Sequence, residues 1–291
     1  MDICCSFIFL LKPYVAVLGY GGAVSCPDSF LFRIIIKHIT MENDNVMALE
    51  PVKGKSILIT GGTTGIGRAT AVLLASMGAN VMIVGTDQQH LDQALEDIRK
   101  TALGEVSGIL ADLATEEGIV LIFTQADISL ERLDVLINNA ALAFGSVTEG
   151  EYQDWKKIVD TNLLAYLACS SQAITRMKAA GWGHIVNIGS MSADVREEKS
   201  AVYVATKSAI QGFSASLRKQ VNTEGIKVTL IEPGAVDTDM QPEDTQAKKK
   251  HVGNMEMLSA DDIAAAVYYC LSQPKRCDVV ELKIRPHHQL I

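Results

Sequence analysis

Thr60-Gly61-Gly62-Thr63-Thr64-Gly65-Ile66-Gly67 is the stretch of sequence that determines the fold. It follows an apolar run of strand length, Ser56–Thr60, and precedes a helical pattern of apolar residues through Met77. Glycines in this turn permit a tight bend, close approach of the backbone to a diphosphate and close packing of the helix on the strand. The amino end of the following helix favours negative charge. The stretch therefore predicts a strand, turn and helix that bind a dinucleotide.

Short apolar runs alternate with longer amphipathic stretches from Ser56 onward, which is typical of a parallel sheet covered by helices on both faces. The predicted strands are Ser56–Thr60, Val81–Val84, Val106–Leu110, Leu133–Asn138, His184–Ile188, Val228–Glu232 and Val279–Ile284. With no internal repeat and no Ser/Pro-rich linker, we predict a single α/β domain over residues 51–291. Its core is a Rossmann-type, doubly wound, seven-stranded parallel sheet.

Two of the intervening helices carry capping signals. Asp87 can cap a helix that runs through Leu103. Ser259, with Asp262 three residues on, forms a capping box for a helix through Leu271. The stretch between the last two units, Asp239 to Leu258, is predicted to be a loop that covers the substrate.

Composition restricts the partners of the chain. Its 291 residues include 26 Lys and Arg against 34 Asp and Glu, a net charge of −8, so no basic surplus could neutralise a nucleic acid. The cationic run Lys248–Lys250, followed by His251, is interpreted as a solvated loop. The six cysteines have no metal-ligand spacing. We expect free thiols in a reducing compartment, no metal site and no nucleic-acid partner.

Residues 1–50 differ from the rest and are interpreted as an N-terminal extension. Lys12 and Pro13 separate two apolar segments, Ile3–Leu11 and Tyr14–Cys26, so neither reaches the ~18–20 residues of a membrane-spanning helix. Asp2 is the only early charge, which disfavours a signal peptide, although Ala23-Val24-Ser25 resembles a cleavage site. We expect a cytoplasmic protein with no stable membrane span. The extension, disordered or lying upstream of a natural start at Met41, leaves targeting to an organelle or membrane open.

A tyrosine and a lysine form the candidate catalytic pair. Tyr203 and Lys207 are four residues apart, so on a helix they share one face and the ammonium can lie near the phenol. A free phenol has a pKa of ~10, and a nearby cation lowers it by favouring the phenolate. Such a pair is common on helix surfaces, so whether it is catalytic depends on the motifs that accompany it.

Further motifs surround this pair. Ser190 lies 13 residues before Tyr203, just past the apolar strand His184–Ile188, where a doubly wound fold places groups that face a ligand. Ser192 is a nearby alternative. Asn162 stands in Asp160-Thr161-Asn162-Leu163, and Asp112-Leu113 follows the third predicted strand.

Together these motifs resemble the short-chain dehydrogenase/reductase family over residues 52–285. The Gly-rich turn resembles its TGxxxGxG motif, and Tyr203-Val204-Ala205-Thr206-Lys207 matches its YxxxK signature. Pro233-Gly234-Ala235-Val236-Asp237-Thr238 resembles its PGxxxT segment. Asn138-Asn139-Ala140-Ala141 resembles its NNAG motif but departs at Ala141, whose methyl group replaces glycine at the floor of the cofactor site.

The resemblance implies an oxidoreductase that transfers a hydride between a nicotinamide cofactor and a small carbonyl or alcohol, and that forms a homodimer or homotetramer. In such an enzyme Tyr203 transfers the proton, Ser190 hydrogen-bonds the substrate oxygen, Lys207 tunes the phenol, and Asn162 holds a relay water. The residues that would bind the cofactor are Gly61, Thr63, Thr64, Gly65, Ile66, Gly67, Thr86, Asp112, Leu113, Asn139, Ala140, Tyr203, Lys207, Pro233, Gly234, Val236 and Thr238.

The end of the second predicted strand indicates that NADP(H) is preferred, with NAD(H) possible. NAD enzymes of the family usually end this strand with an acidic residue, which binds the ribose hydroxyls and repels a 2'-phosphate. Gly85 stands at that position and Thr86 follows it. A hydroxyl holds phosphate less strongly than a guanidinium, and Asp87 would add repulsion if its side chain turned inward. The predicted preference is therefore modest.

Two other functions share parts of these motifs. A non-catalytic sensor or partner subunit could bind NADP(H), but nothing in that role requires Asn162, Ser190, Tyr203 and Lys207 together. Nucleotide-sugar epimerases and dehydratases share the Tyr-x3-Lys pair but usually carry TGxxGxxG and a longer C-terminal part. The tail Val279–Pro286 resembles the NADP-dependent 3-hydroxy acid and serine dehydrogenase branch.

Overall fold

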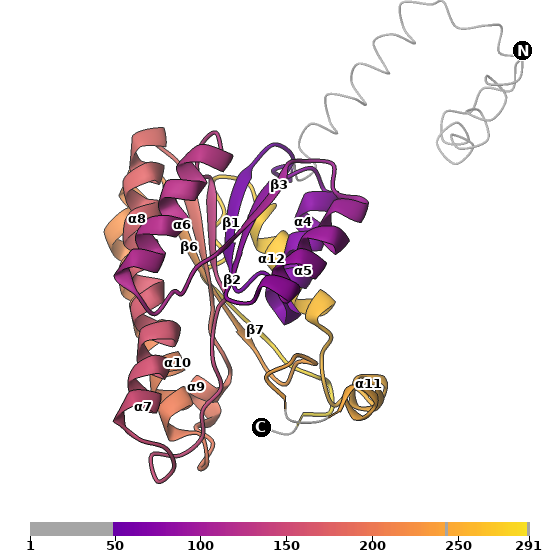
Figure 1. The fold of residues 1–291 in the computed structure, drawn as a ribbon. Coiled ribbons are helices and arrows are strands. Elements are labelled where there is room, and N and C mark those ends of the chain that lie inside the picture. The colour runs from indigo at the N-terminus through magenta and orange to yellow at the C-terminus, as the bar shows by residue number, and fades with distance from the viewer. Residues whose placement is uncertain (1–48, 242–243, 290–291) are drawn as a thin grey trace, which may run out of the picture. The chain divides into compact units, whose positions relative to one another are not determined.

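A computed structural model describes residues 49–241 and 244–289. Its centre is a seven-stranded, entirely parallel sheet in the order β3-β2-β1-β4-β5-β6-β7 (Figure 1). The strands are β1 (Ser56–Thr60), β2 (Asn80–Gly85), β3 (Val106–Leu110), β4 (Val135–Asn138), β5 (Gly183–Ile188), β6 (Ile226–Pro233) and β7 (Glu281–Ile284). The strand order reverses between β1 and β4, which is where ligands bind in open α/β sheets. The predicted doubly wound fold is confirmed.

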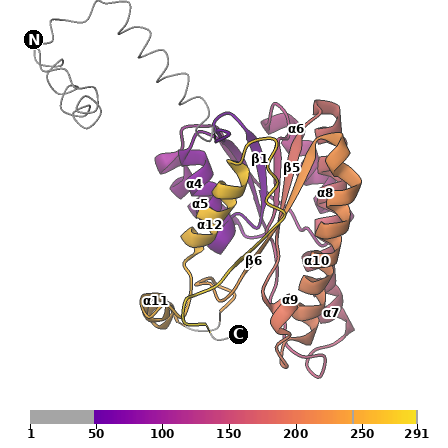
Figure 2. The same ribbon diagram turned by 180° about the vertical axis from the view of Figure 1, so that it is seen from behind.

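Helices cover both faces of the sheet, as Figures 1 and 2 show from opposite sides. One layer consists of α4 (Gly65–Ser76), α5 (Gln88–Thr101) and α12 (Ala260–Leu271). The other consists of α6 (Glu116–Ser129), α8 (Ala165–Ala180) and α10 (Ala201–Val221). The remaining helices are α7 (Tyr152–Val159), the π-helical turn η1 (Asp160–Leu164), α9 (Ser192–Val195), the short η2 (Asn222–Glu224) and α11 (Thr245–Gly253).

Alternate residues of the central strands form two hydrophobic cores. On β1, Ile57 and Ile59 pack with buried residues of α4, α5 and α12. Leu58, between them, packs with buried residues of α6, α8 and α10. All three are fully buried, which explains why the strand appears in the sequence as a continuous apolar run.

The predicted caps form as expected. The Asp87 side chain accepts a hydrogen bond from the His90 backbone N–H at 2.8 Å, and α5 begins at Gln88, directly after Asp87. Ser259 and Asp262 form the reciprocal capping box of α12. Each of these side chains satisfies a backbone N–H that has no partner within its helix.

The segment from Asp239 to Leu258 is not the simple loop that we predicted, because it contains α11. Lys248, on this helix, is buried rather than solvated. Its Nζ donates to the Thr238 carbonyl at 2.9 Å and lies 3.6 Å from Asp237 Oδ1. These partners compensate the burial of the charge and tie α11 to the segment that follows β6.

The N-terminal extension lies outside the described residues, apart from its last two positions, 49 and 50. Within the described part of the chain, no helix has the length and apolar character needed to cross a membrane. The three cysteines described, Cys169, Cys270 and Cys277, are free thiols, as predicted.

Candidate active site

A cleft of about 760 Å³ lies at the carboxyl ends of the strands and brings most of the predicted site residues together. Those that line it are Gly61, Thr63, Thr64, Gly65, Ile66, Thr86, Asp112, Leu113, Asn139, Ala140, Ser190, Tyr203, Lys207, Pro233, Gly234, Val236 and Thr238. Gly67 and Asn162 do not line it. The cleft thus joins the turn after β1 to residues from β4, β5, β6 and α10.

The Gly-rich turn is held by close backbone packing. Gly61 has φ of +61°, a conformation that side chains disfavour. A Cβ on Gly67 would lie 2.1 Å from the Gly61 carbonyl oxygen, so this glycine permits contact within the turn rather than with a ligand. Asn139 Nδ2 donates to the carbonyls of Thr60 and Gly61, at 3.0 and 2.9 Å. The amide therefore joins β4 to the turn.

The first turn of α4 offers donors to an anion. Thr64 is its N-cap, but the Thr64 side chain makes no capping hydrogen bond. Thr64, Gly65 and Ile66 all line the cleft. The N–H groups at this end of α4 donate no hydrogen bond to the N-cap side chain, so they can donate to a diphosphate. These residues therefore fit a dinucleotide.

The residues after β2 line one end of the cleft. A Cβ on Gly85 would lie 2.4 Å from the Thr63 methyl carbon, so this glycine packs against the Gly-rich turn. The Asp87 carboxylate accepts from the backbone of α5 and is therefore engaged in capping. His90, one turn into α5, also lines the cleft. Sequence reasoning did not identify His90, because no motif includes it.

Ser190 and Tyr203 meet at the other end of the cleft. Ser190 Oγ accepts from the Ser192 backbone N–H at 3.1 Å, which fixes the hydroxyl beside α9. Burial raises the pKa of Tyr203, while a hydrogen bond with Ser190 lowers it and the Glu197 charge raises it further. Because burial is the largest of these effects, the phenol stays protonated at neutral pH.

Lys207 is fully buried below this pair. Its Nζ donates to the Ile188 carbonyl at 2.9 Å and lies 5.7 Å from the centroid of the Tyr203 ring. Burial lowers the pKa of Lys207 to about 8, and the charge of Glu232 opposes this shift. We expected Lys207 to lower the pKa of the phenol, but the pKa of Tyr203 is raised. Burial is the largest cause of this rise in pKa, and the Lys207 ammonium donates to the strand rather than to the phenol.

Asn162 is fully buried in the π-helical turn η1. Its Oδ1 accepts from the Leu142 N–H at 2.7 Å and its Nδ2 donates to the Leu142 carbonyl at 2.8 Å. The side chain therefore positions the segment after β4, which forms part of the cleft wall. Its Nδ2 also lies 3.4 Å from Thr206 Oγ1, so the amide joins this segment to α10 as well.

Glu197 and Gln289, which sequence reasoning missed, also line the cleft. Glu197 Oε1 accepts from the Ser192 hydroxyl at 3.0 Å. Gln289 Oε1 accepts from the Ala235 N–H at 3.2 Å, within the Pro-Gly segment. Glu197 lies in the sequence between Ser190 and Tyr203, and this position could have identified it as a residue near the site. Gln289 follows the last strand and no spacing indicated it.

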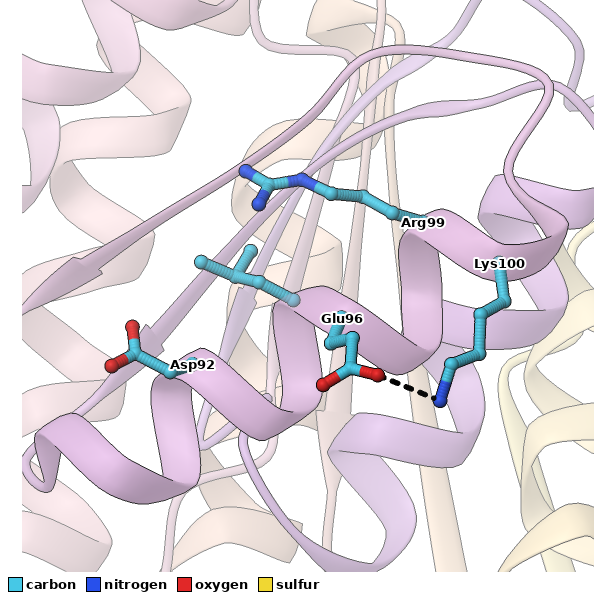
Figure 3. Close-up of a pocket in the computed structure, with 5 residues that line it drawn as sticks. Asp92, Glu96, Arg99 and Lys100 are labelled. Carbon is cyan, nitrogen blue, oxygen red and sulfur yellow. Dashed lines mark ion pairs between the residues drawn. The ribbon is translucent and has the colours of Figure 1, made fainter.

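A second hollow runs along α5, away from the predicted site residues (Figure 3). It is lined by Asp92, Leu95, Glu96, Arg99 and Lys100, and it contains a Glu96–Lys100 ion pair of 3.2 Å between exposed side chains. The spacing is that of ordinary neighbours on a helix surface. No group of three or more metal-ligating side chains occurs among residues 49–241 and 244–289.

Comparisons with known proteins agree with this geometry. A family model described as short chain dehydrogenase matches residues 55–249. An uncharacterised oxidoreductase of Staphylococcus saprophyticus is 31% identical over 237 residues, which are 81% of this chain and 98% of the relative. A short-chain dehydrogenase of Burkholderia cenocepacia, solved in complex with NADP, has a TM-score of 0.72 and 27% identity, covering 81% of this chain and 98% of that one. A blue fluorescent protein from a metagenomic library, solved with NADPH, has the same TM-score and coverage and 26% identity. The chain thus belongs to the short chain dehydrogenase family and is an oxidoreductase of that type.

Proposed function

We propose that the protein transfers a hydride between NADP(H) and a carbonyl or alcohol substrate, with Tyr203 as the proton-transferring residue. The observation that carries the proposal is the convergence of Ser190, Tyr203 and Lys207 on the same cleft as the Gly-rich turn. A protein that only binds the cofactor would need the turn, but not a serine and a tyrosine that line the cleft together.

When bound, the nicotinamide supplies or accepts the hydride. In the reducing direction Tyr203 donates its proton to the substrate oxygen, and its raised pKa keeps the phenol in the form that donates. Ser190 presents its hydroxyl to the same oxygen while its Oγ accepts from Ser192. The Ile188 carbonyl holds Lys207 at the base of the site, where its ammonium can donate to the nicotinamide ribose.

NADP(H) rather than NAD(H) is supported by the absence of an acid at Gly85. Asp87, two residues further on, also lines the cleft, but its carboxylate caps α5. Thr63, Thr86 and His90 line this end of the cleft and can donate to a 2'-phosphate. Two related structures contain NADP or NADPH. We therefore propose a modest preference for the phosphorylated cofactor.

A homodimer or homotetramer is also proposed. Val159, Leu164 and Leu167 are 41%, 53% and 38% exposed on consecutive turns of α7, η1 and α8. An apolar stripe of this kind is typical of a surface that a second copy covers. Light scattering of the purified protein tests this, and a monomer at micromolar concentration would contradict it.

The test of the proposed function is a screen of the purified protein with NADPH against ketones, 3-oxo acids and quinones. The 3-oxo acids test the resemblance of the tail to 3-hydroxy acid dehydrogenases. We expect oxidation of NADPH with at least one carbonyl and its loss in Tyr203→Phe. Tight NADPH binding with no turnover on the entire panel would favour the sensor or partner-subunit alternative.

A further inference from the structure

A buried carboxylate lies behind the candidate active site and outside the cleft. Glu232, near the end of β6, is fully buried. Its Oε1 accepts from Gln211 Nε2 at 2.9 Å, whereas its Oε2 has no hydrogen-bond partner among the described residues and has the Lys283 ammonium at 3.6 Å. Burying a carboxylate with one unsatisfied oxygen costs free energy, so its presence calls for an explanation.

Glu232 and Lys207 approach the same stretch of backbone from two directions. Lys207 Nζ donates to the Ile188 carbonyl. The Glu232 side chain packs against the next residue, Gly189, where a Cβ would lie 3.1 Å from Glu232 Cγ. The pairing of β5 with β6 sets this arrangement, because Ile188 stands opposite Ile231, the neighbour of Glu232.

Helix α10 provides a second link between Glu232 and Lys207. Gln211, which donates to Glu232, follows Lys207 by four residues, so both side chains lie on one face of the helix. Lys207 therefore lies one turn from the residue that binds the carboxylate. In this buried region a charge acts more strongly than it would in water.

We propose that Glu232 is a positioning residue whose buried carboxylate holds Lys207 in the ammonium form on the Ile188 carbonyl. This inference rests on the proposed function only in its use of Lys207 as a residue that contacts the cofactor. Glu232 itself acts through Lys207 and touches no substrate.

The other ionisable groups around the pair do not replace this interaction. Lys207 faces two phenols, Tyr166 and Tyr203, with Nζ 5.6 and 5.7 Å from their ring centroids. Burial raises the pKa of both phenols, so they remain neutral. Glu232 also faces the following charged residues of α9 and β7: Asp194, Glu281 and Lys283.

Lys283 compensates Glu232 only in part. Its Nζ is bonded to Asp194, lies 3.1 Å from Glu281 Oε1 and is 3.6 Å from Glu232 Oε2. Two other carboxylates thus share this cation. The charge of Glu232 raises the pKa of Lys207 against the opposing effect of burial. Without that carboxylate, Lys207 should lose its proton at a lower pH.

The experiment compares Glu232→Gln with Glu232→Asp and Glu281→Gln over pH 6 to 10. Glutamine keeps an oxygen that accepts from Gln211 but removes the charge, aspartate keeps the charge, and Glu281→Gln removes a carboxylate on the other side of Lys283. Two quantities are measured at each pH: the NADPH dissociation constant by cofactor fluorescence, and kcat/KM for reduction.

We expect the alkaline loss of NADPH affinity, and of kcat/KM, to move to lower pH by about one unit in Glu232→Gln, as loss of one nearby buried charge predicts. Glu232→Asp and Glu281→Gln should keep the wild-type profile. An unshifted profile in folded Glu232→Gln, or the same shift in Glu281→Gln, would overturn the inference. If no carbonyl is reduced, the proposed function fails while the binding profile still tests Glu232. If Glu232→Gln does not fold, the other two variants still test the inference. It would be overturned if the pH profile of NADPH binding shifts in Glu232→Asp, which keeps the charge, while that of Glu281→Gln stays as in the wild type.

Discussion

Tyr203 and Lys207 share one face of α10, but the lysine donates to the Ile188 carbonyl on β5 and not to the phenol. The strand therefore fixes the position of the ammonium, and the helix fixes that of the tyrosine. The separation of the Lys207 nitrogen from the Tyr203 ring centroid, 5.7 Å, leaves the ammonium free to act on a third group.

Tyr203→Phe should keep NADPH binding and lower kcat by about 10²–10⁴-fold, because the proton donor is lost while the ring remains. Lys207→Ala should weaken both binding and turnover. Steady-state kinetics with fluorescence titration of NADPH separate these effects. Tyr269→Phe, on the exposed side of α12, is the matched control. Near-normal turnover in Tyr203→Phe would refute the mechanism.

Gly85→Asp should move the ratio of kcat/KM for NADPH to that for NADH toward NADH by at least about tenfold, because a carboxylate repels the 2'-phosphate and binds the ribose hydroxyls. A Cβ here also meets the Thr63 methyl, so the steric effect needs its own control. Gly85→Ala adds the methyl group without the charge, so it should move the ratio less than Gly85→Asp, and the difference between the two variants measures the effect of the carboxylate. A wild-type protein that favours NADH tenfold would contradict the proposed cofactor preference.

Two glycine-to-alanine substitutions should change stability in opposite directions. Gly67→Ala forces a methyl group against the Gly61 carbonyl and should lower the free energy of unfolding by about 1–3 kcal/mol, with loss of NADPH affinity. Gly212, within α10, has open space around its Cβ position, so Gly212→Ala should raise that free energy by about 1 kcal/mol. Urea unfolding measures both. Equal effects would show that packing in the turn is looser than described.

His184 should make the protein less stable in mild acid. Burial, followed by the charges of Lys227 and Lys55, lowers its pKa from 6.5 to about 3. Between these values the unfolded chain binds a proton that the folded chain does not, so stability falls as pH falls below 6.5. The maximum slope is about 1.4 kcal/mol per pH unit.

Urea unfolding of His184→Gln at pH 7, 6 and 5 tests this. Glutamine can still donate to Thr229 Oγ1, which lies 2.8 Å from His184 Nε2, but it does not titrate. In the variant, the free energy of unfolding should fall less steeply as the pH is lowered below 6.5, because the contribution of His184 is absent. The same slope in both proteins would exclude His184 as its source.

The sequence predicted the sheet because a strand covered on both faces leaves an apolar run whatever surrounds it, as in Ile57, Leu58 and Ile59. Strand boundaries differed by up to two residues. At β4, predicted from Leu133, the strand begins at Val135. Just before it, the Asp134 N–H donates to the Ser56 carbonyl and the Asp134 side chain accepts from the Ser56 N–H. That contact joins residues far apart in the chain, and no local pattern records it.

Parts of the site were beyond prediction for a similar reason. The burial of Lys248 depends on the Thr238 carbonyl and on the helix that presents the lysine, whereas a run of three lysines usually indicates a solvated surface. The role of the Asn162 side chain depends on the backbone of Leu142, to which nothing in the Asn162 motif points. Motif spacing identified which residues converge, and the packing determined what each of them holds.

The π-helical turn η1 constrains the length of the chain. Its Ala165 N–H bonds back to Asp160, one residue further than in an α-helix. Deleting one residue of this turn would restore α-helical bonding but rotate everything on one side of it by about 100° relative to the other. Asn162 and Leu142 would then separate, or α8 would turn its buried side out of the core. Insertions and deletions between α7 and α8 should therefore be selected against even where every replaced side chain is exposed.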